Sequence, residues 1–278
     1  MKLFKYFLLL AIIGANLASK AQNSFKLPAH EKFTLKNGLT IYLMEQKEIP
    51  MINVSAVFPA GAIYDGNQSG LANLTAMALR HGTKSMTKSQ MESELDFIGA
   101  TLNTYASKES AGLSAKFAAK DRDKVLNIIK DVITAPAFNP AEFEKERQKL
   151  LVGLEQAKES PRSVIGDYFN QAIYGDHPYS NPTSGRATTV SKLTADDARR
   201  FYQAQYMPNG AAIAVVGDFN TKEMKTKLTA LFSNWQKGTA PANIASKPIN
   251  KPSQAKVLVV NKDDARETTF YIGGPGIS

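Results

Sequence analysis

The 278-residue sequence contains no cysteine and only three histidines, His30, His81 and His177. Without cysteine the chain cannot form a disulfide or a thiolate metal site, so any zinc site must use histidine and carboxylate ligands. A chain of this length can be stable through core packing alone. The shortage of histidine therefore restricts metal chemistry to very few positions.

The sequence also lacks a block of basic residues and a long hydrophobic run. Its net charge is +9, but lysine and arginine are interleaved with acidic residues, as in EFEKERQK at 142–149. Charge spread in this way is typical of a solvated surface and argues against a nucleic-acid partner. The longest apolar stretch, near the N-terminus, is too short to span a bilayer.

The first 21 residues are predicted to be a secretory signal peptide. Lys2 and Lys5 supply the positive region, residues 7–15 the apolar core, and residues 19–21 a cleavage site with small side chains that ends at Ala21. A retained membrane anchor is the alternative. Cleavage near Ala21 would remove three lysines and lower the net charge from +9 to +6.

Apolar periodicity and turn signals predict strands and helices along the rest of the chain. Strands are expected on both sides of Asn37-Gly38, from residue 51, on both sides of Lys108-Glu109, and at 211–219. Helices are expected at 70–80, 87–98, 121–135 (with Asp121 as cap), 139–160, 161–174, 194–205 and 221–235. This order predicts an α+β fold, a mostly antiparallel sheet with helices packed on one face.

The chain is predicted to hold one large domain and the beginning of a second. The first domain spans residues 25–237. Residues 238–254, rich in proline, alanine and serine, are expected to be a linker. Residues 255–278 contain two strand-like runs around a charged turn. Because an isolated hairpin is marginally stable, we interpret them as the start of a truncated second domain or as an addition to the first sheet.

Eight short segments in series resemble those of one protein family. They are LKNGLTIYL, AGAIYD, SGLANL, HGTKS, LNTYASKE, FEKERQKLL, YGDHPYSNPTSG and FYQAQYMPNGAAIAVVGDF, between about residues 31 and 220. In this order they resemble the pitrilysin/insulinase-type zinc peptidases (inverzincins), and among these the bacterial proteins similar to mitochondrial processing peptidase. The resemblance implies a peptidase-like domain, and a second, related domain that opens after residue 255.

The chemistry of that family depends on an H-x-x-E-H motif on the helix after the Gly-Leu-Ala element. Its two histidines lie one helical turn apart and bind zinc, its glutamate takes a proton from the zinc-bound water, and a later glutamate completes the ligand set. In this sequence the four positions fall on Asn73, Ala76, Met77 and Gly153. The resemblance therefore implies a degenerate site, without catalytic residues or metal ligands.

The side chains at these positions are poor substitutes for the family's. The Asn73 amide oxygen is a weak partner for Zn²⁺, the Met77 thioether prefers Cu(I), and Ala76 cannot accept a proton. We expect no cofactor here, and zinc only in active relatives or in a partner subunit. The alternative is an active zinc endopeptidase with displaced ligands, for which the candidates are His81, His177 and Glu155. His81 is otherwise interpreted as a loop histidine, and His177 as structural.

In active relatives the substrate adds as a strand to the sheet edge near the element that LNTYAS resembles. The resemblance makes Asn103 and Thr104 candidate peptide-binding residues; the alternative is that 101–106 is an inner strand. The family precedent predicts a non-catalytic subunit that pairs with a zinc-bearing subunit of the same family and helps to enclose and bind peptides. A stand-alone exported peptide-binding or scaffold protein is the alternative. The resemblance favours the periplasm of a two-membrane bacterium or the cell exterior.

Overall fold

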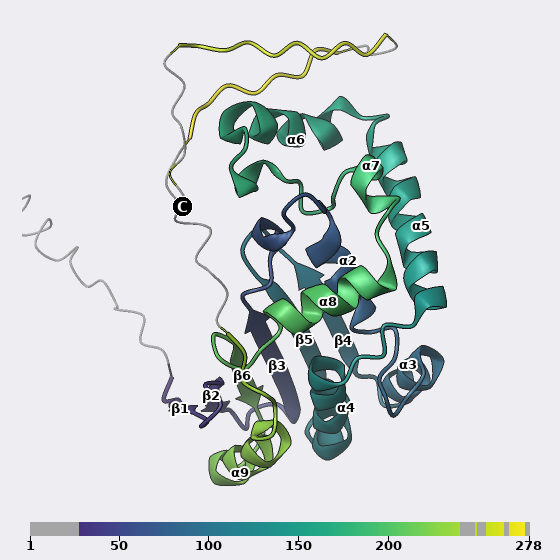
Figure 1. Ribbon diagram of the computed structural model, residues 1–278. Coiled ribbons are helices and arrows are strands. Elements are labelled where there is room, and N and C mark those ends of the chain that lie inside the picture. The colour runs from purple at the N-terminus through teal and green to yellow at the C-terminus, as the bar shows by residue number, and fades with distance from the viewer. Residues whose placement is uncertain (1–27, 240–247, 249–253, 264–266, 276–278) are drawn as a thin grey trace, which may run out of the picture. The chain divides into compact units, whose positions relative to one another are not determined.

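The computed structural model describes residues 28–239, 248, 254–263 and 267–275 (Figure 1). The chain divides into two units, residues 1–30 and residues 31–278, and the fold below is that of the second. The expected signal peptide, residues 1–21, lies outside the described residues, as does most of the expected linker at 238–254.

A six-stranded sheet forms the centre of the fold. Its strands are β1 (Glu31–Thr34), β2 (Thr40–Glu45), β3 (Met51–Phe58), β4 (Thr101–Ala106), β5 (Ala111–Ala118) and β6 (Ala212–Gly217). They lie in the order β1-β2-β6-β3-β5-β4. The β2–β6 pair is parallel and the other four pairs are antiparallel, which confirms the predicted mostly antiparallel sheet. Strand β4 ends the sheet, so the alternative of an inner strand at 101–106 is wrong.

One face of the sheet is buried and the other is open. In β3 the side chains of Ile52, Val54, Ala56 and Phe58 are buried, whereas the intervening Asn53, Ser55 and Val57 are exposed. This alternation follows from the two-residue period of a strand. The apolar residues of β3 therefore specify which face carries the core.

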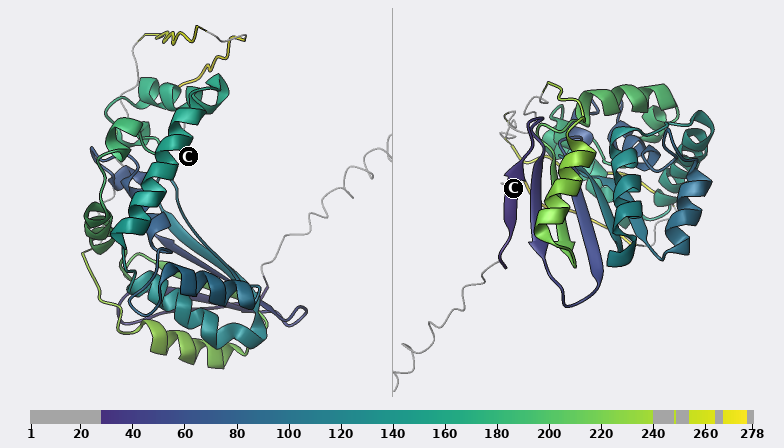
Figure 2. Two further views of the ribbon diagram at one scale, coloured as in Figure 1. Left: turned by 90° about the vertical axis from the view of Figure 1, so that its right-hand side faces the viewer. Right: turned by 90° about the horizontal axis from the view of Figure 1, so that it is seen from below.

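Helices cover the buried face, as the views in Figures 1 and 2 show. The helices are α2 (Leu71–Ala78), α3 (Lys88–Phe97), α4 (Arg122–Thr134), α5 (Pro140–Ala157), α6 (Pro161–Tyr174), α7 (Ala187–Val190), α8 (Ala195–Gln205) and α9 (Thr221–Phe232), of which α6 packs on α5 and η3 (Pro178–Ser180). Short 3-10 helices in the described residues are η1 (Ala62–Tyr64), η2 (Ala119–Asp121) and η3 (Pro178–Ser180). Helix α2 contacts β4, β5, α5 and α8, so it lies at the centre of the helical layer. The α+β prediction is confirmed.

Side chains at the helix starts explain why the helices begin where they do. Thr87 and Thr194 form capping boxes at α3 and α8, and the Asn139 side chain accepts from two backbone N–H groups of α5. The cap expected at Asp121 is confirmed in position only. It occupies the N-cap position of α4, but its side chain makes no capping hydrogen bond. Helix η2 leaves Asp121 with φ −96° and ψ 8°, outside the extended geometry that side-chain capping uses.

The two strand-like runs expected after residue 255 are not strands in the described residues 254–263 and 267–275. Their large apolar side chains, Val257, Val259 and Ile272 among them, are exposed. Two apolar runs without a covering layer gain little from pairing, which is the physical reason for the difference. Among the described residues, no helix has the length and hydropathy needed to cross a membrane.

Candidate functional site

Helix α2, which carries three of the four degenerate positions, is held at its N-terminus by backbone geometry. Gly70 precedes the helix with φ 99°, in the left-handed region that favours glycine. A Cβ at this position would lie 2.9 Å from the Cα of Gly185. The segment before α7 therefore packs directly against the start of α2, and a side chain at Gly70 would separate them.

A buried carboxylate also holds this end of α2. Asp65 accepts hydrogen bonds from the backbone N–H groups of Gly70 and Ala72, each at 2.8 Å, and is 4% exposed. Burial raises the pKa of Asp65 to about 7, because desolvation outweighs the two N–H bonds and the nearby Lys108 ammonium. The start of α2 therefore contains a carboxyl group that changes charge near neutral pH.

We expect this group to make stability depend on pH. Since the pKa of Asp65 is raised on folding, the folded protein binds a proton more tightly than the unfolded chain. The contribution of Asp65 to the free energy of unfolding is therefore largest at low pH and falls as pH rises towards 7. The free energy of unfolding of the wild type minus that of Asp65→Asn, measured by urea unfolding, should fall by about 2 to 4 kcal/mol between pH 4 and pH 7. A difference that rises with pH would mean that the two N–H bonds dominate.

The four degenerate positions lie on two helices that are in contact, α2 and α5. On α2, Asn73 and Met77 are half-buried and one turn apart, and Ala76 is fully buried. Gly153 is exposed on α5, and a Cβ added there would meet no atom within 4 Å. The helix and its one-turn spacing are therefore present, without histidine or carboxylate at these places.

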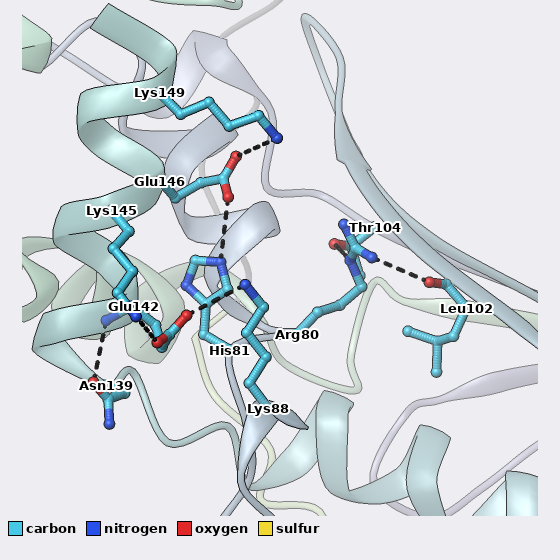
Figure 3. Close-up of polar contacts among 10 residues, drawn as sticks. All are labelled: Arg80, His81, Lys88, Leu102, Thr104, Asn139, Glu142, Lys145, Glu146 and Lys149. Carbon is cyan, nitrogen blue, oxygen red and sulfur yellow. Dashed lines mark hydrogen bonds and ion pairs between the residues drawn. The ribbon is translucent and has the colours of Figure 1, made fainter. Parts of the chain in front are cut away.

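His81, interpreted from the sequence as a loop histidine, follows α2 and is buried (Figure 3). Its Nε2 lies 3.9 Å from Oε2 of Glu146 on α5, and its Nδ1 is buried without a hydrogen-bond partner. Burial lowers the pKa of His81 to about 4, an effect that the nearby Lys88 ammonium reinforces. The imidazole is therefore neutral at neutral pH, and the contact with Glu146 is not an ion pair there.

The candidate displaced ligands are not brought together into a metal site. The exposed Glu155 pairs with Lys158 one turn further along its helix. His177 accepts a hydrogen bond at 3.2 Å from the backbone N–H of Tyr179, which agrees with the structural interpretation. Among the residues that the structure describes, no three histidine, cysteine or acidic side chains could hold a metal ion. The donor set does not fit zinc.

The candidate peptide-binding residues lie side by side on the edge strand β4 but differ in exposure. Asn103 is exposed, and Thr104 is half-buried because it faces α2. The Thr104 hydroxyl accepts a hydrogen bond from Nε of Arg80 at 3.3 Å, and Nη1 of Arg80 donates to the Leu102 carbonyl at 3.4 Å (Figure 3).

Arg80 belongs to this site, although no motif in the sequence pointed to it. A signal in the spacing was present, because Asn73, Met77 and Arg80 are spaced four and three residues apart and so share one side of a helix. In the structure these three are the residues between 71 and 80 that are not buried. We call them the α2 stripe.

Comparison with known families decides the identity of this fold. The profile described as "Insulinase (Peptidase family M16)" matches residues 41–187, more than half of the chain. The chain belongs to the M16 peptidase family. A second profile, "Peptidase M16 inactive domain", matches residues 192–278. Strand β6 lies in this second segment, yet it pairs with β2 and β3 of the first, so one sheet joins the two matches.

Individual M16 relatives support the assignment over most of the chain. An uncharacterized zinc protease of Rickettsia felis is 26% identical over 87% of this chain and 58% of its own length. Subunit 1 of the bovine mitochondrial cytochrome b-c1 complex is 25% identical over 74% of this chain and 43% of its own length. A crystal structure of a peptidase M16 inactive domain from Pseudomonas fluorescens superposes with a TM-score of 0.76 at 24% identity, over 81% of this chain and 54% of that one. This M16 chain thus spans about half the length of these relatives.

Proposed function

We propose that this chain is a non-catalytic M16 protein that binds extended peptides. The observation that carries the proposal is the composition of the zinc-binding positions. Helix α2 is present with its one-turn spacing, but Asn73, Ala76, Met77 and Gly153 occupy the places where the resemblance puts two histidines and two glutamates.

The chemistry of these four residues opposes hydrolysis by a zinc centre. Neutral amide and thioether groups at Asn73 and Met77 are poor ligands for Zn²⁺, and Gly153 has no side chain. Ala76 offers no proton acceptor, so the position of the general base is empty of the group that the reaction needs. Because Ala76 is fully buried, a water molecule next to its methyl group cannot take that role. The buried His81 and its neighbour Glu146 do not form a zinc site either, because no third histidine or acidic side chain among the described residues joins them to hold a metal ion.

Peptide binding needs less specialised chemistry, and β4 supplies it. An edge strand has unpaired backbone N–H and C=O groups that can pair with an extended peptide, while side chains beside it select the sequence. Strand β4 lies next to α2, so a peptide added to β4 would pass the α2 stripe. This supports retained peptide binding in the absence of the catalytic groups.

A zinc-bearing subunit of the same family is the partner that we propose. Two of the relatives illustrate the two types of protein that share this sequence pattern, since one is named as a zinc protease and the other as a subunit of a complex. We further propose that the chain is exported, on the basis of the apolar N-terminal segment with Lys2, Lys5 and the small residues before Gln22.

Zinc content tests the proposal directly. We expect the purified chain, after exhaustive dialysis, to hold below about 0.1 zinc per chain, because the ligand positions lack histidine and carboxylate. Elemental analysis measures the ratio, and an active zinc endopeptidase of the family treated in parallel is the positive control. A ratio near one that survives dialysis would overturn the proposal and direct attention to His81, Glu146 and their neighbours.

A further inference from the structure

Arg80 is the charged member of the α2 stripe and the one that reaches the edge strand. It follows the last turn of α2, and its backbone N–H still bonds the Met77 carbonyl at 3.2 Å. From there the side chain extends to β4, where it contacts Thr104 and the main chain at Leu102 (Figure 3). The guanidinium is therefore fixed next to the edge at which a peptide would add.

This guanidinium has no acidic partner among the described residues. A guanidinium has five N–H donors, and Arg80 uses Nε and Nη1 on neutral oxygens. Among the described residues no ion pair within 4.0 Å joins it to an Asp or Glu oxygen, and it is half-buried. A half-buried cation bonded only to neutral groups retains both its charge and donors for a ligand.

The acidic residues of α5 that lie next to His81 in Figure 3 are already matched by lysines. Glu142 contacts Lys88 at 3.3 Å and Lys145 at 2.7 Å, and Glu146 contacts Lys149 at 3.8 Å (Figure 3). These pairs lie on the His81 side, whereas the Arg80 side chain extends in the direction of β4. The positive charge at the edge strand is therefore not cancelled by the neighbouring helix.

We propose that Arg80 determines the specificity of the β4 edge by binding a carboxylate of the added peptide. This inference rests on the proposed peptide binding. Main-chain pairing with β4 would place alternate peptide side chains on the α2 side of the sheet, where the planar guanidinium matches a carboxylate in shape and charge. The carboxylate belongs either to an acidic side chain or to the C-terminus of the peptide, and the experiment distinguishes these sources.

The test uses three fluorescent ten-residue peptides that share one sequence rich in β-branched residues, which favour an extended conformation. The first has a central Glu and an amidated C-terminus, the second has Gln in place of Glu, and the third has Gln and a free C-terminal carboxylate. Fluorescence anisotropy gives the dissociation constant of each. We expect the wild-type chain to bind one of the carboxylate peptides about tenfold more tightly than the neutral one.

Variants assign this preference to Arg80. Arg80→Gln should reduce the preference for the carboxylate peptide to less than about twofold while leaving the affinity for the neutral peptide within about twofold. Arg80→Lys, which keeps the positive charge, should retain part of the preference. Lys116→Gln is the matched control. Lys116 lies on β5 opposite Thr101 and is exposed on the open face of the sheet. Its substitution removes the same charge and should leave the tenfold preference unchanged. Circular dichroism and urea midpoints confirm that each variant is folded.

The outcomes separate the two proposals. If the wild type binds none of the three peptides, the proposed peptide binding itself is wrong. If it binds all three equally and Arg80→Gln changes nothing, peptide binding stands and the role of Arg80 is wrong. An equal loss of preference in Lys116→Gln would also overturn the assignment, because the effect would then be a general attraction by positive charge.

Discussion

The triple variant Asn73→His, Met77→His, Gly153→Glu should hold about one zinc per chain after dialysis, compared with below about 0.1 for the native chain. The two histidines would lie one turn apart on the half-buried stripe of α2, a spacing that directs both imidazoles at one ion. Gly153 follows Glu146 by seven residues, two helical turns, and so lies on the face of α5 that meets the segment after α2. Open space around Gly153 accommodates the new carboxylate.

Controls of similar composition make this prediction specific. Placing the glutamate at the neighbouring exposed Val152 instead of Gly153 turns it about 100° around α5 and should lower zinc affinity at least about tenfold. Equal zinc binding by both would show that the inferred register of α5 is wrong. The triple variant should still not hydrolyse peptides, because Ala76 remains without a proton acceptor. Peptide cleavage above the rate of the native chain would contradict the importance that we give to Ala76.

Phe58→Ala should be the most destabilising single truncation of the core, by about 3 to 5 kcal/mol. Phe58 ends β3 and is 0% exposed. Its ring lies 5.1 Å from that of Tyr206, after α8, and 6.1 Å from that of Trp235, after α9. Truncation would leave a cavity between the sheet and two helices and remove contacts that join segments far apart in the sequence. Urea unfolding measures the change.

Phe97→Ala is the matched control for this cavity. Phe97 is the last residue of α3 and is 87% exposed, so the same truncation should change the free energy of unfolding by less than about 0.5 kcal/mol. Similar losses for both variants would mean that the Phe58 ring is not buried as the structure describes. A loss in Phe58→Ala accompanied by a lower m-value would instead indicate a change in cooperativity.

The elements themselves were predictable from local patterns. Alternation along β3, the turn at Asn37-Gly38 and the starts of the helices expected from residues 87, 139 and 194 each depend on neighbours within a few positions, and all appear in the structure. Asp121 takes the expected N-cap position, but its side chain makes no capping hydrogen bond because the 3-10 helix that ends there changes its backbone geometry. The runs after residue 255 fit the pattern of strands, but their described residues do not pair as strands, and a pattern alone does not supply a neighbouring strand.

The sequence by itself determined the family resemblance, the α+β class and the four positions at which Asn73, Ala76, Met77 and Gly153 stand, because these depend on residue types and on fixed helical spacing. Tertiary structure decided what the spacing could not. It placed β6 between β2 and β3, made β4 the edge of the sheet, buried Asp65 and His81, and brought Arg80 to Thr104. Each of these depends on contacts between distant segments, and local periodicity carries no information about which segments meet.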